Sequence, residues 1–253
     1  PEDQKYQINV KNMNKYLYQD LYDLEDKHWW HISKRNIVLR LIYNYVQEKS
    51  PKILDIGCGT GKNLEALSNI GQAYGLDNAK EAISFCKKRG LKNLKLGDAE
   101  DTQYPNSFFD VVTALDVIEH AEENNISKEI HRILKKDGII IVTVPANQWL
   151  WSKWDVVLRH KRRYTKKTLS DLLKRHHFKI LRISYMYSFL VLPALIIRKI
   201  KEKLSRNYYA SDFKLSTPFI NWFLLRISSL ESALVIRGYL PFGTSLICVA
   251  KKV

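Results

Sequence analysis

The feature that most constrains the fold is a short apolar segment, residues 53–56, that runs directly into a glycine-rich loop. The segment contains Asp55, and the loop places Gly57, Gly59 and Gly61 at alternate positions. Glycine suits such a loop because its backbone adopts positive φ and lets a ligand approach where a Cβ would collide. A helical pattern begins at residue 62. We therefore expect a strand, a tight turn and a helix start that form a nucleotide-binding corner, with a glycine turn that binds nothing as the alternative.

Alternating strand and helix patterns surround this corner. We expect strands at residues 52–56, 72–76, 94–96, 109–115, 139–144, 178–185 and 244–249. The intervening helices are expected near residues 62–69, 79–89, 125–134 and 165–176, with a turn at 135–138 and an earlier helix that follows an N-cap at Ser33. This alternation predicts an α/β fold with a doubly wound, mostly parallel sheet of seven strands.

The chain divides into three expected parts. Residues 1–50 form an N-terminal helical lid rich in aromatic side chains, residues 51–185 and 243–253 form the core, and residues 186–242 form an apolar and basic insertion between the last two strands. The first apolar run of the insertion is interrupted by Pro193 and is shorter than the roughly 20 residues that a bilayer-spanning helix needs. We expect an interfacial or capping helix instead.

Charge is distributed unevenly along the chain. Residues 1–150 contain 20 Lys and Arg against 21 Asp and Glu, whereas residues 151–253 contain 21 against 5, and the formal net charge is +15. Such a basic region attracts nucleic acid, anionic membranes or anionic substrates, with solubility as the alternative. The three cysteines form no C-x-x-C pair, so we expect reduced thiols in a cytoplasmic protein, placed peripherally at the inner face of the membrane if it binds lipid.

Further motifs narrow the kind of nucleotide site. Asp77 follows the second expected strand, where an acidic side chain can accept hydrogen bonds from ribose hydroxyls. Through residues 54–61, 75–77, 97–99, 109–112, 116–120 and 134–138, the chain resembles the class I S-adenosylmethionine-dependent methyltransferases, especially the broad group that includes ubiquinone-biosynthesis O-methyltransferases. The resemblance covers residues 50–145 and the last strand. It implies a Rossmann-like methyltransferase fold, S-adenosylmethionine as the cofactor and methyl transfer as the reaction.

The resemblance also implies roles for single residues. It places the cofactor-binding residues in the glycine loop and near the ends of the strands: Asp55, Gly57, Cys58, Gly59, Gly61, Asp77, Asp98, Ala99, Leu115 and Asp116. Asp55 would lie near the methionine amino group and Asp77 would hold the ribose hydroxyls. Asp98 would meet the adenine amino group, with Ala99 nearby. Leu115 and Asp116 would line the pocket close to the sulfonium, and carboxylates suit a site for two cationic groups.

A general base is required only if the acceptor starts protonated. His120 and His160 are the candidates, because histidine titrates near neutral pH. Some relatives among the quinone O-methyltransferases bind a divalent cation at an acidic, histidine-containing turn. We expect no metal here, with Asp116, Glu119 and His120 as the alternative ligand set.

The segments 145–164 and 186–242 should both overhang the cofactor, and the aromatic N-terminal segment should join them. The expected acceptor-binding residues are aromatic or basic: Trp29, Trp30, Trp151, His160, Arg162, Arg163 and Tyr164. An apolar cover with a basic rim predicts an anionic lipid or prenyl-type acceptor, lipid phosphates included, at a membrane surface. The alternatives are a cytosolic small-molecule or sugar O-methyltransferase and, less favoured, an RNA methyltransferase. We expect no nucleic-acid partner, and the oligomeric state stays open.

Overall fold

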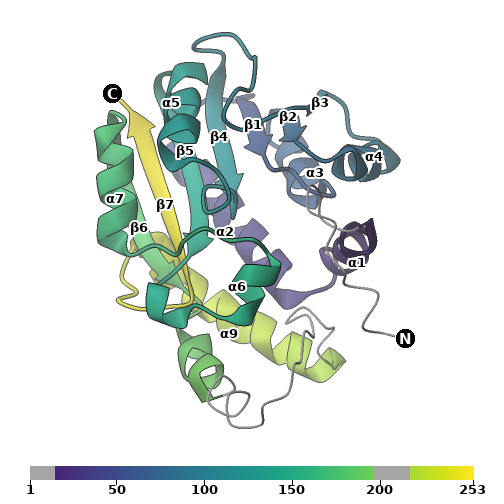
Figure 1. Ribbon diagram of the computed structural model, residues 1–253, viewed down its shortest axis with the longest axis vertical. Helices are drawn as coiled ribbons and strands as arrows, with labels where there is room; N and C mark the ends of the chain where they lie inside the picture. The colour runs from purple at the N-terminus through teal and green to yellow at the C-terminus, as the bar shows by residue number, and fades with distance from the viewer. Residues whose placement is uncertain (1–14, 197–216) are drawn as a thin grey trace.

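The computed structural model describes residues 15–196 and 217–253, and Figure 1 shows it as a ribbon. The helices are α1 (Lys15–Leu24), α2 (Trp29–Tyr45), α3 (Lys62–Ser68), α4 (Lys80–Lys88), α5 (Glu123–Ile133), α6 (Lys153–Val157), α7 (Lys166–Arg175) and α9 (Pro218–Arg237), with short 3-10 turns η2 (Gln148–Leu150) and η3 (Ser188–Leu190). The strands are β1 (Lys52–Ile56), β2 (Gln72–Asp77), β3 (Leu94–Leu96), β4 (Phe109–Leu115), β5 (Leu134–Pro145), β6 (Phe178–Met186) and β7 (Ser245–Lys252).

The strands form one seven-stranded sheet in the order β3-β2-β1-β4-β5-β7-β6. Strands β1 to β5 are mutually parallel, whereas β7 runs antiparallel to both of its neighbours, β5 and β6. The predicted fold class, a doubly wound and mostly parallel sheet, is confirmed. Because the chain order reverses direction between β1 and β4, the carboxyl ends of these two strands border a crevice suited to a ligand.

Helices cover both faces of the sheet. The crossover through α3 moves from β1 toward β3, and the crossover through α5 moves from β4 toward β7. Right-handed crossovers in opposite directions place these two helices on opposite faces. Helix α7 contacts α5, while α2 contacts both α3 and α9, so α2, α3 and α9 share one face. Between the layers, apolar side chains such as Leu54, Val112 and Ile140 are fully buried.

The helix before β1 begins earlier than the sequence predicts. Helix α2 starts at Trp29, and its N-cap is His28, whose Nδ1 accepts a hydrogen bond from the Trp30 backbone N–H at 3.3 Å. The expected N-cap, Ser33, is instead a buried residue inside the helix. The prediction failed because histidine is not among the usual N-cap residues, whereas serine is.

The expected turn at residues 135–138 is an irregularity inside a longer strand. Leu134 pairs with Phe109, and the next pair joins Ile139 to Val111. The extra residues bulge out of the ladder, with Asp137 at a φ of 62°. Strand β5 therefore begins five residues before the apolar run that signals it in the sequence.

The expected insertion contains η3 and α9 among its described residues. Helix α9 begins at an N-cap, Thr217, and ends at Gly238, which has a φ of 78°. By length and composition α9 could cross a membrane, and only 22% of its apolar window is buried in the protein. It packs on α2 and β6. The basic residues 198–201 of the insertion lie outside the described residues. The division into lid, core and insertion stays a prediction.

Candidate active site

The carboxyl edge of the sheet carries several non-glycine residues in the left-handed backbone region. Asp116 follows β4 with a φ of 57°, Asn147 follows β5 with 60°, and Tyr187 follows β6 with 58°. Such conformations cost about 1–3 kcal/mol each and persist where the surrounding structure enforces them, commonly at functional sites. Positive φ also occurs at six other described non-glycine residues, so it is the glycine loop after β1 that identifies this edge as the candidate active site.

The glycine loop is tightly packed against the turn after β4. Gly57 has a φ of +68°, and a Cβ added to it would lie 2.5 Å from Cγ2 of Val117. Gly61 has a φ of +94°, and its Cβ would lie 2.7 Å from Leu91. Both positions therefore require glycine for conformation and for space. The contact with Val117 also brings the neighbouring residue, Asp116, beside the loop.

Asp77, the last residue of β2, lies beside the glycine loop. Its Oδ2 accepts the Gly59 N–H and its Oδ1 accepts the Ala79 N–H, both at 2.9 Å. Burial raises the pKa of Asp77, and these backbone donors oppose the rise. The Gly97 N–H donates to the Asp77 carbonyl at 3.0 Å, which brings the segment containing Asp98 alongside. Asp98 is exposed, and the adjacent Ala99 is half-buried.

Asp55 lies beneath the loop as a buried carboxyl group. Its side chain is 2% exposed, and its Oδ1 accepts a hydrogen bond from the Thr113 hydroxyl at 2.6 Å. Burial raises the pKa of Asp55 to about 7, although the Thr113 hydrogen bond opposes the rise. A cation bound nearby would favour the ionised form.

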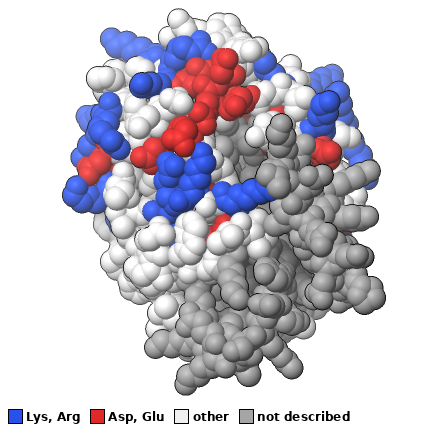
Figure 2. Space-filling view, viewed as in Figure 1, with Lys and Arg blue, Asp and Glu red and all other residues white. Residues whose placement is uncertain are grey.

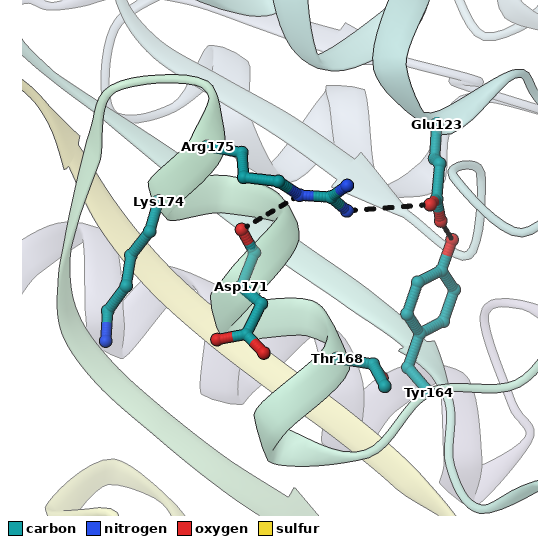
Figure 3. A pocket seen from close by; sticks show the side chains of 6 residues that line it. All are labelled: Glu123, Tyr164, Thr168, Asp171, Lys174 and Arg175. Atoms are coloured by element: carbon teal, nitrogen blue, oxygen red, sulfur yellow. Dashed lines mark hydrogen bonds and ion pairs between the residues drawn. The ribbon is translucent and has the colours of Figure 1, made fainter.

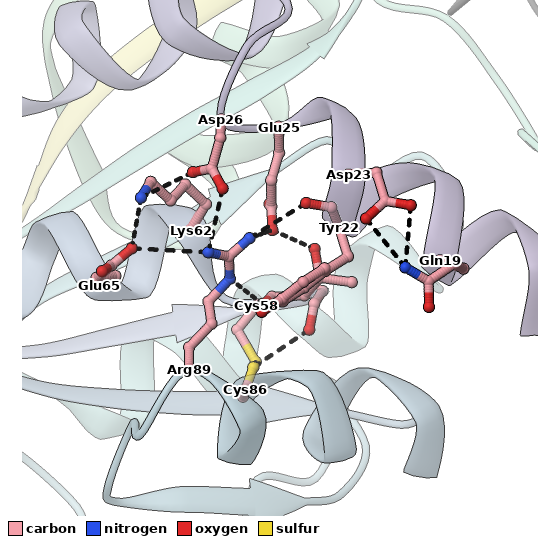
Figure 4. A network of polar contacts seen from close by, with 12 residues as sticks. Gln19, Tyr22, Asp23, Glu25, Asp26, Cys58, Lys62, Glu65, Cys86 and Arg89 are labelled. Carbon is pink, nitrogen blue, oxygen red and sulfur yellow. Dashed lines mark hydrogen bonds and ion pairs between the residues drawn. The ribbon is translucent and has the colours of Figure 1, made fainter.

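Helix α1 covers the glycine loop and is held there by a polar network, which Figure 4 shows from close by. Arg89 donates to Glu25 at 2.7 Å and to the Thr60 carbonyl at 2.9 Å, and the Thr60 hydroxyl donates to Glu25. Tyr18 of α1 is buried against α4, and the nearby Asp77 charge adds to the burial that raises its pKa. The cofactor side of the edge is thus covered by an N-terminal helix.

A second polar cluster lies on the other side of Asp116. The buried Lys34 ammonium donates to Asp116 Oδ2, and the Thr143 hydroxyl donates to Oδ1 at 2.9 Å. Burial alone would raise the pKa of Asp116, but the Lys34 ammonium and the Thr143 hydroxyl hold it below its ordinary value. Leu115, at the end of β4, is half-buried beside it. Asp116 is therefore a fixed carboxylate at the centre of the edge.

Glu119, His120 and His160 converge next to this pair. One potential ligand atom from each lies within 4.8 Å of the others, and the two imidazole centroids are 4.9 Å apart. Glu119 is fully buried, and within residues 15–196 and 217–253 neither of its carboxyl oxygens has a side-chain hydrogen-bond partner. Burial together with the Asp116 charge raises its pKa well above the ordinary value. Asp116 does not join this group because Lys34 holds it. Four-coordinate metal sites need ligand atoms about 2 Å from the ion, so the three side chains would have to draw together to bind one.

The loop between β5 and α7 is built around the buried Asp155. His160 Nδ1 lies 2.9 Å from Asp155 Oδ1, and Arg163 forms two hydrogen bonds with the same carboxylate. Burial alone would raise the pKa of Asp155, but these partners hold it far below its usual range. Asp155 thereby fixes the position of His160.

The comparisons with known proteins agree with this geometry. Residues 54–142 match a family described as a methyltransferase domain. These residues form a methyltransferase domain of the class I S-adenosylmethionine-dependent type.

Similar proteins place this methyltransferase within a broad group. It is 26% identical to a ubiquinone biosynthesis O-methyltransferase of Proteus mirabilis over 52% of this chain and 61% of that protein. It is 31% identical to an uncharacterised protein of Methanocaldococcus jannaschii over 55% of this chain and 56% of the other. A crystal structure of a methyltransferase from Archaeoglobus fulgidus has a TM-score of 0.56 at 20% identity and covers 86% of this chain and 94% of its own. The chain spans less than two thirds of the length of these two sequence relatives, and the crystal structure shows the fold alone.

S-adenosylmethionine is the cofactor of this methyltransferase family, and the residues present fit it. The glycine loop provides a cradle that a Cβ at Gly57 or Gly61 would fill. Asp77 presents a carboxylate to the loop, and Asp55 is a buried carboxyl group without a cationic partner among the described residues. The structure brings Asp55, Gly57, Cys58, Gly59, Gly61 and Asp77 together. Their individual contacts with the cofactor stay predictions.

The residues expected to bind the acceptor fall into two groups. Trp29, Trp30 and His160 lie near the edge, with Trp29 and Trp30 packed against Tyr187 and Trp151 half-buried in the overhanging loop. The other residues are paired with carboxylates of the protein itself. Arg163 holds Asp155, and Arg162 and Tyr164 contact Glu123 at 3.2 and 3.1 Å. We therefore leave Arg162, Arg163 and Tyr164 out of the proposed acceptor site.

Sequence reasoning missed Lys34, Glu25, Tyr18 and Asp155. Their partners are distant in the sequence or lie in a loop, and no motif links them. One available signal was the spacing of Trp30 and Lys34 on a helix, since residues four apart share a face.

An open hollow of about 640 Å³ lies between α5 and α7, away from the glycine loop. It is lined by Glu123, Tyr164, Thr168, Asp171, Lys174 and Arg175. Figure 3 shows Arg175 reaching across to Glu123. Because carboxylates and cations both line it, the hollow selects no ligand charge, and we assign it no role.

Proposed function

We propose that this methyltransferase methylates an amphiphilic acceptor, a lipid or prenyl-type molecule, at the surface of a membrane. The observation that carries the proposal is the apolar outer face of α9. Phe219, Trp222 and Leu230 of this helix are 72%, 52% and 79% exposed. The same face and its surroundings expose further large apolar side chains: Ile220, Phe223, Leu234, Leu192, Ile196, Tyr239 and Phe242.

Such a surface is suited to the interfacial region of a bilayer. Soluble monomers rarely expose contiguous apolar patches beyond a few hundred Å². Helix α9 packs its other side on α2 and β6, and its Glu231 is buried, where it accepts hydrogen bonds from the Tyr187 and Ser188 backbone N–H groups at 2.7 Å. A helix anchored in this way lies on a membrane with one face rather than crossing it.

The apolar face is connected to the acceptor side of the edge. Asn221 of α9 accepts the Trp29 N–H at 2.8 Å and donates to the Lys27 carbonyl at 2.9 Å. These bonds join α9 to the first turn of α2, and the first two turns of this helix carry Trp30 and Lys34. An acceptor held in the membrane would therefore have a short route to Asp116.

The distribution of charged side chains on the surface gives limited support to binding at an anionic membrane. Figure 2 shows groups of Lys and Arg interleaved with Asp and Glu on this face of the protein, and few charged side chains among the described atoms at its lower end. Arg226 lies at the membrane-facing helix, 5.6 Å from the Trp222 ring, which suits a lipid headgroup next to an apolar anchor. The ubiquinone-biosynthesis relative is consistent with a prenyl-type acceptor.

In this proposal the described residues have separate roles in binding the cofactor and in binding the acceptor. The bound cofactor would supply a methyl carbon to an electron pair of the acceptor, with sulfur keeping the electron pair of the broken bond. The glycine loop, Asp55 and Asp77 would hold the cofactor, and α1 would exclude water from it. The acceptor side would be formed by Trp30, Lys34 and His160. The main contribution of the protein is then alignment of the two reactants.

Sedimentation with vesicles tests membrane binding. We expect the chain to sediment with phosphatidylglycerol vesicles, and we expect Trp222→Ser combined with Phe223→Ser to remain in the supernatant. Tyr43→Ser is the matched control, because Tyr43 is 87% exposed on α2 and does not belong to the α9 face. Equal sedimentation of all three proteins would contradict the proposal.

Transfer of labelled methyl groups tests the acceptor class. The chain is incubated with labelled S-adenosylmethionine and a membrane lipid extract, and the label is expected in the organic phase. Label found only in water-soluble products would favour the cytosolic small-molecule alternative, in which the α9 face is covered by a second subunit.

A further inference from the structure

The buried Lys34 of α2 has unused hydrogen-bonding capacity at the acceptor side. Its side chain is 8% exposed, and its ammonium lies 3.3 Å from the centroid of the Trp30 ring. An ammonium group has three donors. Within the part of the chain that the structure describes, its one side-chain hydrogen bond is to Asp116. Donors therefore remain for an oxygen atom of a bound molecule.

The position of Lys34 is fixed relative to the cofactor loop. Asp116, which holds the ammonium, is itself held by Thr143 at the end of β5. The next residue, Val117, packs directly on Gly57 of the loop. The ammonium thus lies at the sheet edge. Its partner Asp116 precedes Val117, the residue that packs on the glycine loop expected to hold the cofactor.

The ammonium contacts the Asp116 carboxylate and the face of Trp30, which belongs to an aromatic cluster. The buried Glu119 carboxyl group also interacts with its charge. The Trp30 ring centroid lies 4.9 Å from that of His31 and 6.3 Å from that of Tyr187. Burial and the Lys34 charge lower the pKa of His31 to about 3, so this imidazole is neutral at physiological pH. Such walls suit a planar ring, and the Lys34 ammonium beside them suits a negatively charged oxygen on that ring.

From this juxtaposition we infer that Lys34 binds the acceptor oxygen that receives the methyl group and holds it as an oxyanion. The acceptor is then a hydroxylated ring, such as a phenol. Its O–H bond breaks, the proton passes to water, and the electron pair stays on the oxygen beside Lys34 for the new bond to carbon. A neutral or protonated amine would gain nothing from this cation. The inference rests on the proposed function in placing the acceptor at this edge.

The test is the ionisation of 4-nitrophenol bound to the full chain, read from the visible absorbance of its phenolate. It is done one pH unit below the pKa of the free probe, with S-adenosylhomocysteine present so that no methyl group is transferred. About a tenth of the free probe is then ionised, and a lowering of its pKa by about one unit on binding ionises about half, an increase of roughly fivefold. A wild-type chain that binds no probe, or binds it without an increase, overturns the inference.

Variants identify the responsible cation. Lys34→Met combined with Asp116→Leu removes both charges and should keep the fold, because a buried ion pair can be replaced by apolar side chains; Lys34→Gln serves where this variant does not fold. Both variants should lose the increase in probe ionisation, and Lys34→Arg should retain it.

The control is Lys52→Gln, since Lys52 also lies over an aromatic ring, 4.1 Å from the Phe108 centroid, but at the start of β1. An undiminished increase in a folded Lys34→Gln protein overturns the inference. Failure of vesicle binding or label transfer leaves this readout unchanged, so the two proposals fail separately.

Discussion

Arg163 and Asp155 form a two-pronged ion pair inside the loop that overhangs the sheet edge. The Arg163 Nε lies 2.8 Å from Oδ1 of Asp155, and its Nη2 lies 2.9 Å from Oδ2. Asp155 is 1% exposed, and Arg163 also donates to the Ala146 carbonyl at 3.1 Å. A guanidinium engaged in this way is not available to an acceptor anion unless the pair breaks. The pair therefore gives Arg163 a role in shaping the loop and, through Asp155, in placing His160.

Arg163→Ala should destabilise the protein by about 3–5 kcal/mol, because it leaves the buried Asp155 carboxylate without its cation. Arg162 provides the matched control. It pairs with Glu123 at the surface, with 27% of its side chain exposed, and Arg162→Ala should cost less than about 1 kcal/mol. Urea denaturation of both variants measures the difference. Equally small losses in both, with weaker acceptor binding in Arg163→Ala alone, would restore the acceptor-binding role to Arg163.

Cofactor affinity should depend on pH through Asp55, whose pKa is raised by burial to about 7. The ionised carboxylate favours the expected methionine ammonium, so binding below this pH must also remove a proton. The Kd for S-adenosylmethionine should fall by up to about tenfold per pH unit as the pH rises toward about 7, and level off above it. The stability of the unliganded protein has the opposite dependence on pH. A raised pKa stabilises the protonated form, so stability falls as pH rises from about 4 through about 7.

Calorimetric titration at several pH values checks this dependence. Asp55→Asn should bind more weakly at pH 8 and show a nearly flat profile. Asp110→Asn, on the neighbouring strand β4, should keep the slope of the wild type. A slope that survives in Asp55→Asn would assign the titration to another group.

Asp77 should contribute more to cofactor binding than Asp98. Asp77 is buried and already oriented by the Gly59 and Ala79 N–H groups, so it can accept ribose hydrogen bonds without reorganisation. At about 1.5–3 kcal/mol for each hydrogen bond to a charged group, the loss of two gives a rise in Kd of roughly a hundredfold or more in Asp77→Ala. Asp98→Ala, at an exposed position, should raise Kd by less than about tenfold. Comparable losses in calorimetry would show that the adenine side dominates binding.

Strands and the cofactor turn could be predicted because their signals are local. Strands β1, β3 and β4 have the expected bounds, since each contains apolar residues and ends directly before a glycine or an acidic residue. The predicted start of α2 was wrong because a histidine N-cap has no reliable local pattern. The predicted start of β5 was wrong for the same reason, since a strand that continues through charged residues is not signalled locally.

The contacts around the edge could not be predicted because their partners are far apart in the chain. Lys34 and Asp116 are separated by 82 residues, and Arg89 and Glu25 by 64. Only the packing of α1 and α2 against the sheet brings them together. Arg163 illustrates the same limit at short range. A cluster of basic residues predicts an anion, but the sequence does not distinguish an external anion from an internal carboxylate eight residues away.

Arg89 should control how firmly α1 covers the cofactor loop. It joins Glu25 to the Thr60 carbonyl, and the side chains of Arg89 and Glu25 are both 8% exposed. Arg89→Ala leaves a buried carboxylate unpaired, at a cost of about 3–5 kcal/mol. Local opening of α1 should then become at least a hundredfold more frequent and appear as faster hydrogen exchange in Lys15–Leu24. Cofactor affinity should fall as well. Lys87→Ala is the control and should change neither, because Lys87 is an exposed residue of α4, the helix that Arg89 caps. Unaltered exchange in α1 of Arg89→Ala would mean that the apolar contacts of Tyr18, rather than this ion pair, hold the helix on the loop.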